Sequence, residues 1–124
     1  MIIGVGIDIV DIDDFRKRLT PGLEAELFLP PEREYASSMA RPWENLAVRF
    51  AAKEAAFKAL GTGLSGGIRW HDVEIVRDGT GRVSLRFHGR AGELAAGLEV
   101  RGQHLSMSHS RHSAIAVVML EGAR

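Results

Sequence analysis

Acidic and basic side chains stand close together in one short segment of the chain, residues 49–58. Glu54 and Lys58 are four residues apart, so they share one face of a helix, where such a pair contributes about 0.2–0.5 kcal/mol. Alanine and phenylalanine residues flank Glu54, which predicts packed surroundings for its carboxylate. A second carboxylate, Asp8, follows two glycines near the start of the chain. These side-chain types support acid–base and metal-dependent chemistry.

Lys53 falls inside an apolar stripe of the same segment, which is an unusual place for a lysine. Two interpretations remain open for it. Its stem extends along the core so that the ammonium reaches the edge, or its ammonium contacts a ligand.

Histidine and serine alternate on a late segment, with His104, Ser106 and Ser108 on one face and His109 and His112 near a turn. The two later histidines have a metal-like spacing, but no further nitrogen or sulphur ligand accompanies them, so zinc is not expected. A serine–histidine pair lacks the context of a nucleophile elbow. We interpret these hydroxyls as ordinary polar groups on a half-buried strand.

Glycines follow the acidic and basic segment as Gly61-Thr62-Gly63 and Gly66-Gly67. No Gly-Lys-Ser/Thr follows, so this is not a Walker A loop. The glycines act as helix caps, or they let backbone amides approach a phosphate.

A strand is expected at residues 2–10, where β-branched residues alternate with small or polar ones. We expect the β-branched face to point into the core. Glycine weakens a strand, so the opposite face indicates a bulge or close packing against a helix. The β-branched face consists of Ile3, Val5, Ile7 and Ile9, and the opposite face of Gly4, Gly6, Asp8 and Val10.

Short helices are expected at residues 11–19 and 23–29 and from Pro30 to Arg41-Pro42, followed by a long helix at about 43–60. The long helix carries Lys53, Glu54 and Lys58, and the Gly61-Thr62-Gly63 cap closes it.

Two hairpins are expected in the second half, at residues 73–76 with 83–87 and 104–109 with 113–120, with a short helix at 90–98 between them. The last strand is apolar on both faces, so we expect it to be central in a sheet or pressed against a partner. This order predicts an α+β fold with a mainly antiparallel sheet, packed against one long and several short helices.

Composition restricts the class of protein. The 124 residues suit one domain, 1–124, and the absence of cysteine excludes disulfides and thiolate metal sites. Sixteen basic and sixteen acidic residues give no net charge, which argues against nucleic-acid and membrane partners. No signal peptide or membrane span is expected, so we predict a cytoplasmic protein.

Two parts of the chain resemble the bipartite signature of the phosphopantetheinyl transferases. They are Gly6-Ile7-Asp8 and the pair of motifs RFAAKEA, residues 49–55, and KALGTG, residues 58–63. The short chain and the segment Ser106-Met107-Ser108-His109 resemble the holo-acyl-carrier-protein synthase branch, whereas the other branch holds two such units. The resemblance runs from residue 4 to about residue 120.

The resemblance implies the phosphopantetheinyl transferase fold and a reaction. Such enzymes transfer the 4'-phosphopantetheine of coenzyme A (CoA) to a serine of an apo acyl carrier protein and release adenosine 3',5'-bisphosphate. Asp8 and Glu54 match the family's Mg²⁺ ligands, and two hard carboxylates from separate elements suit that ion. Glu54, directly or through a metal-bound water, is the implied base for the carrier serine. Lys58 matches the lysine near the pyrophosphate.

The resemblance also implies contacts with CoA. Arg49 and His109 match positions that meet the 3'-phosphate and the nucleotide, and an arginine fork suits that charge. Lys53 and Gly63 lie within the same motifs and are expected to contact CoA as well. The family is typically a homotrimer with active sites between subunits.

One position departs from the family pattern. Relatives commonly carry a basic residue in the first helix, where it helps to dock the acidic carrier protein, whereas this chain has Asp14. Arg16, Lys17 and Arg18 follow shortly afterwards and are the expected docking residues.

Two alternatives to the enzyme remain open. One is a non-catalytic CoA- or nucleotide-binding module of the same fold. The other is a purely structural oligomer in which Glu54 and Lys58 form an ordinary helix pair.

Overall fold

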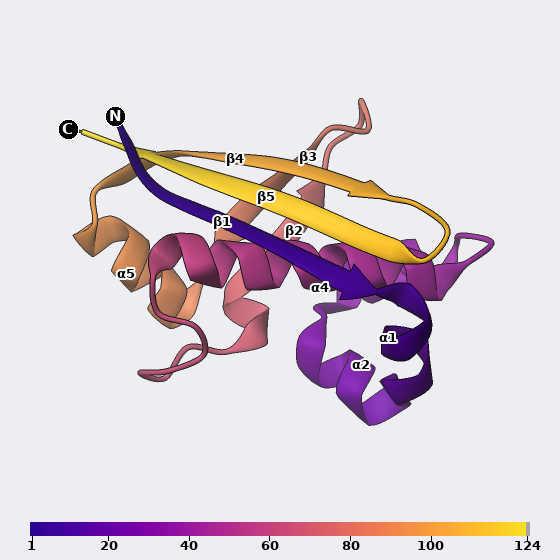
Figure 1. Cartoon of the computed structure of the whole chain (residues 1–124). Helices are drawn as coiled ribbons and strands as arrows, with labels where there is room; N and C mark the ends of the chain where they lie inside the picture. The colour runs from indigo at the N-terminus through magenta and orange to yellow at the C-terminus, as the bar shows by residue number, and fades with distance from the viewer. Residues whose placement is uncertain (124) are drawn as a thin grey trace.

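A three-stranded antiparallel sheet lies along one long helix in the computed structural model, which describes residues 1–123 (Figure 1). The strand order is β1 (Ile2–Asp11), β5 (Ser113–Gly122) and β4 (Val100–His109). The last strand is therefore central, as its two apolar faces predicted. The long helix, α4 (Pro42–Leu60), packs against β1 and β5 and ends at Gly61 in the left-handed conformation that favours glycine.

Three short helices gather at one end of α4, close to the end of β1 (Figure 1). They are α1 (Ile12–Arg18), α2 (Pro21–Leu27) and α3 (Pro30–Ser37). Side chains that precede the first two helices cap them, as Asp11 accepts from the amide of Asp14 and Thr20 from that of Leu23.

The third short helix ends earlier than expected, at Ser37 rather than at Arg41-Pro42. The hydroxyls of Ser37 and Ser38 donate to the carbonyls of Glu34 and Tyr35, and such bonds compete with continuation of the helix.

The second half contributes a two-stranded hairpin and one more short helix. A 3₁₀ turn (Trp70–Asp72) leads into β2 (Val73–Arg77), which pairs antiparallel with β3 (Val83–Phe87), and α5 (Gly89–Gly97) follows. Every strand pairing described is antiparallel, so the α+β prediction with a mainly antiparallel sheet is confirmed. Within residues 1–123, no helix combines the length and the apolar character that crossing a membrane requires.

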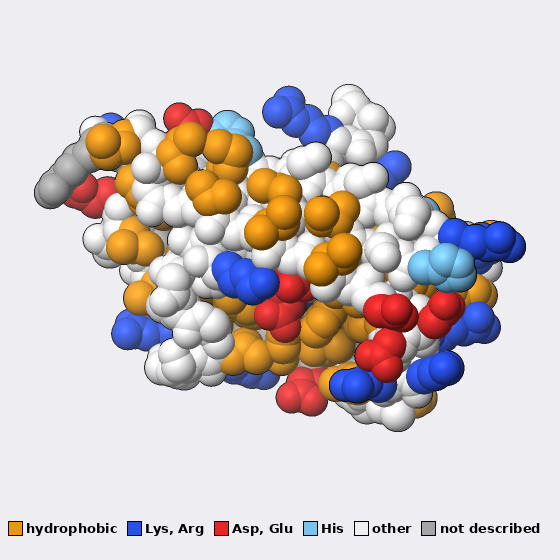
Figure 2. Space-filling model, in the orientation of Figure 1, with side chains coloured by type: hydrophobic (Ala, Val, Ile, Leu, Met, Phe, Trp, Pro, Cys, Tyr) orange, Lys and Arg blue, Asp and Glu red, His pale blue; other side chains and the backbone are white. Residues whose placement is uncertain are grey.

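The face of β1 that packs on α4 is the opposite of the one predicted. Val5, Ile7 and Ile9 are 57%, 55% and 67% exposed. Figure 2 shows hydrophobic side chains in a band over this strand. The helix instead contacts the face that begins with Gly4 and Gly6, since only a face without side chains lets the two backbones come this close.

Candidate active site

Asp8 reaches the long helix because the two preceding residues on its face of β1 are glycines. A Cβ atom at Gly6 would lie 1.8 Å from the carbonyl oxygen of Ala55, and one at Gly4 would lie 2.2 Å from that of Ala59. The strand therefore rests on the helix backbone, which confirms the expected close packing. Asp8 follows these two glycines on this face, and it lies beside the part of α4 that carries Glu54 and Lys58.

Lys58 crosses from α4 to β1. Its Nζ lies 3.1 Å from Oδ1 of Asp8 and donates a 2.9 Å hydrogen bond to the carbonyl of Ile7. Within residues 1–123 Glu54 forms no ion pair with Lys58. The two residues are therefore not the ordinary helix pair that their spacing also suggested.

These three side chains line one hollow of about 610 Å³. Asp11, Asp14 and Arg18 are the other charged residues of its lining, and the rest of the wall is apolar. The rings of Phe50 and Trp70 pack together there, with centroids 5.2 Å apart and planes tilted by 33°. The other apolar side chains of the wall are Ile9, Val10, Phe15, Leu23 and Leu27.

The carboxyl of Glu54 holds its proton more strongly than an ordinary glutamic acid. Burial raises its pKa, the nearby charge of Asp8 raises it further, and Lys58 lowers it. A carboxylate with a raised pKa is a better proton acceptor. The hollow therefore contains a candidate base, Glu54, beside Asp8, whose charge Lys58 offsets.

A second hollow, of about 360 Å³, contains Arg49 and His109. Arg49 is almost fully buried, and its Nη1 donates to Asn45. Arg49 and Glu54 are five residues apart, so they project from α4 about 140° from each other. The two hollows share none of their lining residues, so one chain holds Asp8, Glu54 and Lys58 in one group and Arg49 and His109 in another.

Comparison with known proteins decides what kind of protein carries this arrangement. The model of the 4'-phosphopantetheinyl transferase superfamily matches residues 4–118. The chain belongs to this superfamily. It is 45% identical over 124 residues to the holo-[acyl-carrier-protein] synthase of Koribacter versatilis, covering 98% of this chain and 99% of the relative. The Geobacter sulfurreducens synthase is 47% identical, with 98% of each chain covered.

Solved structures of transferases have the same fold. The holo-(acyl-carrier-protein) synthase of Bacillus anthracis, in complex with CoA (3',5'-ADP), matches with a TM-score of 0.83 and 35% identity over 99% of each chain. The Neisseria meningitidis synthase matches with a TM-score of 0.86 and 30% identity over 98% of this chain and 99% of that one. The predicted family and fold are thus confirmed.

The carboxylates of this transferase suit Mg²⁺ only together with further oxygen ligands from a substrate. Within residues 1–123, no group of three or more histidine, aspartate or glutamate side chains could hold a metal. Asp8 and Glu54 supply two hard carboxylates, and the pKa of Glu54 is raised by burial and then by the charge of Asp8. Mg²⁺ is commonly held by one or two carboxylates together with substrate phosphates and water, so the residues present fit the ion.

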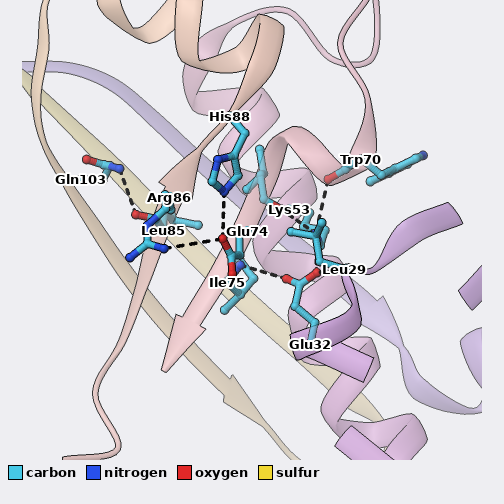
Figure 3. A network of polar contacts seen from close by, with 11 residues as sticks. Leu29, Glu32, Lys53, Trp70, Glu74, Ile75, Leu85, Arg86, His88 and Gln103 are labelled. Atoms are coloured by element: carbon cyan, nitrogen blue, oxygen red, sulfur yellow. Dashed lines mark hydrogen bonds and ion pairs between the residues drawn. The ribbon is translucent and has the colours of Figure 1, made fainter. Parts of the chain in front are cut away.

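Lys53 points into the protein interior, and its expected contact with CoA stays a prediction. Its side chain is completely buried, and its Nζ lies 2.9 Å from Oε1 of Glu32 on α3 and donates to the carbonyls of Trp70 and Val73 (Figure 3). Burial lowers the pKa of Lys53, and Glu32 opposes this shift. Lys53 therefore joins α3, α4 and β2 inside the protein.

Gly63 lies in the loop after α4 and lines neither of the two hollows. Its contact with CoA stays a prediction.

Sequence reasoning missed two residues that line the hollows, Trp70 and Arg77. Trp70 follows the glycine-rich loop, and nothing in the sequence of this loop indicates where Trp70 lies in the fold. Arg77 directly follows the strand predicted at residues 73–76, and the structure extends β2 to include it. A charged residue beside a short strand was its only signal in the sequence.

Proposed function

We propose that residues 1–124 form one domain that transfers 4'-phosphopantetheine from CoA to a serine of apo acyl carrier protein and releases adenosine 3',5'-bisphosphate. The observation that carries this proposal is the convergence of Asp8, Glu54 and Lys58 in one hollow. The relatives are named for this activity, and the Bacillus anthracis enzyme is described with CoA (3',5'-ADP).

The side chains of this hollow have separate roles in the transfer. Glu54 accepts the proton of the carrier serine, and the serine oxygen then bonds to the phosphorus that carries the pantetheine arm. The bond from this phosphorus to the oxygen bridging the two phosphates breaks, and adenosine 3',5'-bisphosphate leaves. Lys58 neutralises part of the charge that collects on the phosphate oxygens. The raised pKa of Glu54 favours its role as the proton acceptor.

Magnesium dependence is part of the proposal. Asp8 and Glu54 would hold the ion, which supplies positive charge to the pyrophosphate when it is bound. Lys58 now offsets the charge of Asp8 and is long enough to turn toward a phosphate instead.

We further propose that the enzyme works as a homotrimer with active sites between subunits. Arg49 and His109 lie in a different hollow from Glu54, so the two hollows of one copy are poorly placed for a single CoA. A neighbouring copy can complete the site. The exposed apolar side chains of β1, Val5, Ile7 and Ile9, support an interface on that face because exposed apolar patches mark association surfaces. Light scattering during gel filtration tests the assembly, and a monomer that still transfers would contradict it.

Docking of the carrier protein is proposed at α1, which borders the hollow of Asp8 and Glu54. Arg18 and Asp14 line this hollow, whereas Arg16 and Lys17 do not. Figure 2 shows basic and acidic side chains gathered around α1. The acceptor is expected to be the carrier of fatty acid biosynthesis, and the cytoplasm stays the predicted location.

Mass spectrometry of an apo carrier protein tests the function directly. After incubation with the chain, CoA and magnesium, the carrier is expected to gain one phosphopantetheine group. A chain that binds CoA without transferring it would be the non-catalytic module. A chain that does neither would be the structural oligomer.

A further inference from the structure

A third hollow, of about 530 Å³, adjoins the hollow of Asp8 and Glu54. Its lining comes from Ala25 and Glu26 of α2 and from Leu64 and residues 68–71 of the segment between α4 and β2. It contains none of the side chains to which the transfer is assigned above. This hollow therefore has no role in the proposed chemistry.

Trp70 is the one described residue that lines both of these hollows. Its ring packs against Phe50, with centroids 5.2 Å apart, and edge-on against Phe57, with centroids 5.4 Å apart. Its carbonyl accepts a 3.3 Å hydrogen bond from Nζ of Lys53. Residues of α4 thus hold both the ring and the backbone, and the indole is a fixed wall between the two hollows.

The third hollow has an exposed apolar side chain in an unusual place. Residues 61–67 are glycine, serine and threonine except for Leu64, which is 45% exposed and lines the hollow. Ile68, the next apolar residue of the chain, lines it as well. An apolar ligand that covers Leu64 would remove this surface from water, which is favourable.

The polar residues of the lining leave room for such a ligand. Nε2 of His71 lies 2.8 Å from the carbonyl oxygen of Ala25, which can only accept, so this nitrogen donates and is already paired. Glu26 and Arg69 are exposed, so their charges can stay in water while a ligand occupies the hollow.

The proposed reaction determines which end of the substrate comes near this hollow. The phosphorus that the carrier serine attacks lies by Asp8, Glu54 and Lys58, and the pantetheine arm extends from this phosphorus. The arm ends in a thiol, and in an acyl-CoA this thiol carries an acyl group as a thioester. An arm that follows the apolar wall toward Trp70 places its thiol beside the indole, and a group attached to the thiol then continues into the third hollow.

We propose that the third hollow binds the acyl group of an acyl-CoA, and that Leu64 and Trp70 are specificity-determining residues for this group. The chain then transfers acyl-phosphopantetheine as well as phosphopantetheine. The same phosphorus–oxygen bonds form and break as with CoA, and the thioester stays intact. This proposal rests on the transferase function proposed above, because that function places the phosphorus.

Calorimetry on the intact protein without carrier protein tests the proposal, since no transfer occurs under these conditions. The probes are acetyl-CoA and octanoyl-CoA, which differ by six methylene groups. Burial of one methylene favours binding by up to about fourfold, so octanoyl-CoA is expected to bind at least about tenfold more tightly than acetyl-CoA. Equal affinities for the two probes would overturn the proposal.

Two substitutions on different elements locate the acyl group. Leu64→Asn keeps the approximate size of the side chain and is expected to weaken binding of octanoyl-CoA by about three- to tenfold and that of acetyl-CoA by less than about twofold. Ala25→Phe fills the hollow from α2 and should abolish the preference for octanoyl-CoA. Leu98→Asn is the matched control because Leu98 is 47% exposed and lines a different hollow, so it should change neither affinity.

A preference for octanoyl-CoA that survives both Leu64→Asn and Ala25→Phe would place the acyl group elsewhere and overturn the proposal. Mass spectrometry of the carrier protein separates this proposal from the transferase function. If the unmodified chain transfers phosphopantetheine from CoA but binds both probes equally, only this inference fails. If it selects octanoyl-CoA through Leu64 but transfers nothing, only the transferase function fails.

Discussion

The ammonium of Lys58 lies 3.1 Å from the carboxylate of Asp8, across the contact between α4 and β1. Glu54, one helical turn earlier, is left without an ion pair in the part of the chain that is described, and it faces the charge of Asp8. One cation therefore serves two carboxylates. Burial raises the pKa of Glu54 and the charge of Asp8 raises it further, so the site gains from a second cation.

Glu54→Gln is expected to separate activity from stability. The variant keeps the size of the side chain and removes the proton acceptor, so transfer should fall by about 100-fold or more. Its melting temperature should rise at neutral pH, because the variant no longer buries a carboxylate beside Asp8. Transfer assays and thermal melting without added magnesium measure both quantities.

The stability that Glu54→Gln gains over the unmodified chain should increase with pH. Because the pKa of Glu54 is raised in the folded protein, this carboxyl favours folding while it is protonated and loses that contribution as the pH rises through its folded-state pKa. The melting difference between Glu54→Gln and the unmodified chain should be close to zero near about pH 4, grow as the pH rises toward that folded-state pKa and level off above it. Glu93→Gln alters an exposed carboxylate on α5 and should show no such trend. Near-normal transfer by folded Glu54→Gln would refute the role of Glu54.

Removal of magnesium is expected to stop transfer and leave the fold intact. A chelator should abolish phosphopantetheine transfer, and added Mg²⁺ should restore it, since the carboxylates hold the ion only together with substrate oxygens. Asp8→Asn should not recover at the same Mg²⁺ concentration because it lacks one charged ligand. Full activity of the unmodified chain in excess chelator would contradict magnesium dependence.

Local sequence patterns predicted most of the helices and strands. Which face of β1 packs on α4 depends on long-range contacts, which such patterns do not show. Alternation in residues 2–10 correctly indicated a strand, but it could not show which face meets a helix. The hydrophobic character of Ile7 and Ile9 predicts burial of their side chains. The deciding contact joins Gly6 to Ala55, forty-nine residues later, and only the folded chain reveals it.

Gly6→Ala is expected to damage the site from a distance. Its methyl group would lie 1.8 Å from the carbonyl oxygen of Ala55, so β1 must move away from α4. Transfer should fall by at least about tenfold and unfolding should become easier by about 1–3 kcal/mol. Gly79→Ala is a matched control because a Cβ atom there meets nothing within 4 Å and its φ is not positive. Unchanged activity in Gly6→Ala would show that Asp8 does not depend on this contact.

Lys53 illustrates why the candidate site was only partly predictable. Its neighbours Glu54 and Lys58 line the hollow, and the shared motif led us to expect Lys53 in the same site. Its partner Glu32 lies on another helix, and no local signal connects the two. The ion pair became visible only when α3, α4 and β2 were assembled.

Lys53→Met is expected to destabilise the protein by about 3–5 kcal/mol because it leaves Glu32 charged and buried without its partner. Adding Glu32→Gln should recover part of the loss, since its amide oxygen still accepts a hydrogen bond and carries no charge. Unfolding in urea measures both variants. If Lys53→Met instead left stability unchanged and weakened CoA binding alone, Lys53 would be a CoA contact after all.

Of the three basic residues that were predicted to dock the carrier protein, the structure favours Arg18. The guanidinium of Arg16 lies 3.6 Å from the centroid of the Trp43 ring, which occupies it within the protein. Arg18 lines the hollow of the carboxylates, but Asp14 lies 3.3 Å from its Nε and reduces its attraction for an acidic partner. Arg18→Glu should therefore raise the KM for carrier protein, and Asp14→Asn should lower it.

Salt provides the decisive comparison for these two variants. Charges at the rim of an interface act mainly on association and are screened at high ionic strength. The effects of Arg18→Glu and Asp14→Asn on the carrier KM should each be about three- to tenfold at low salt and should disappear at about 1 M salt, where the Debye length is near 3 Å. The KM for CoA should not change in either variant. Lys17→Glu alters an exposed charge that does not line the hollow, so it should have a smaller effect. If Lys17→Glu impairs the carrier KM more than Arg18→Glu does, the carrier docks on another face of α1.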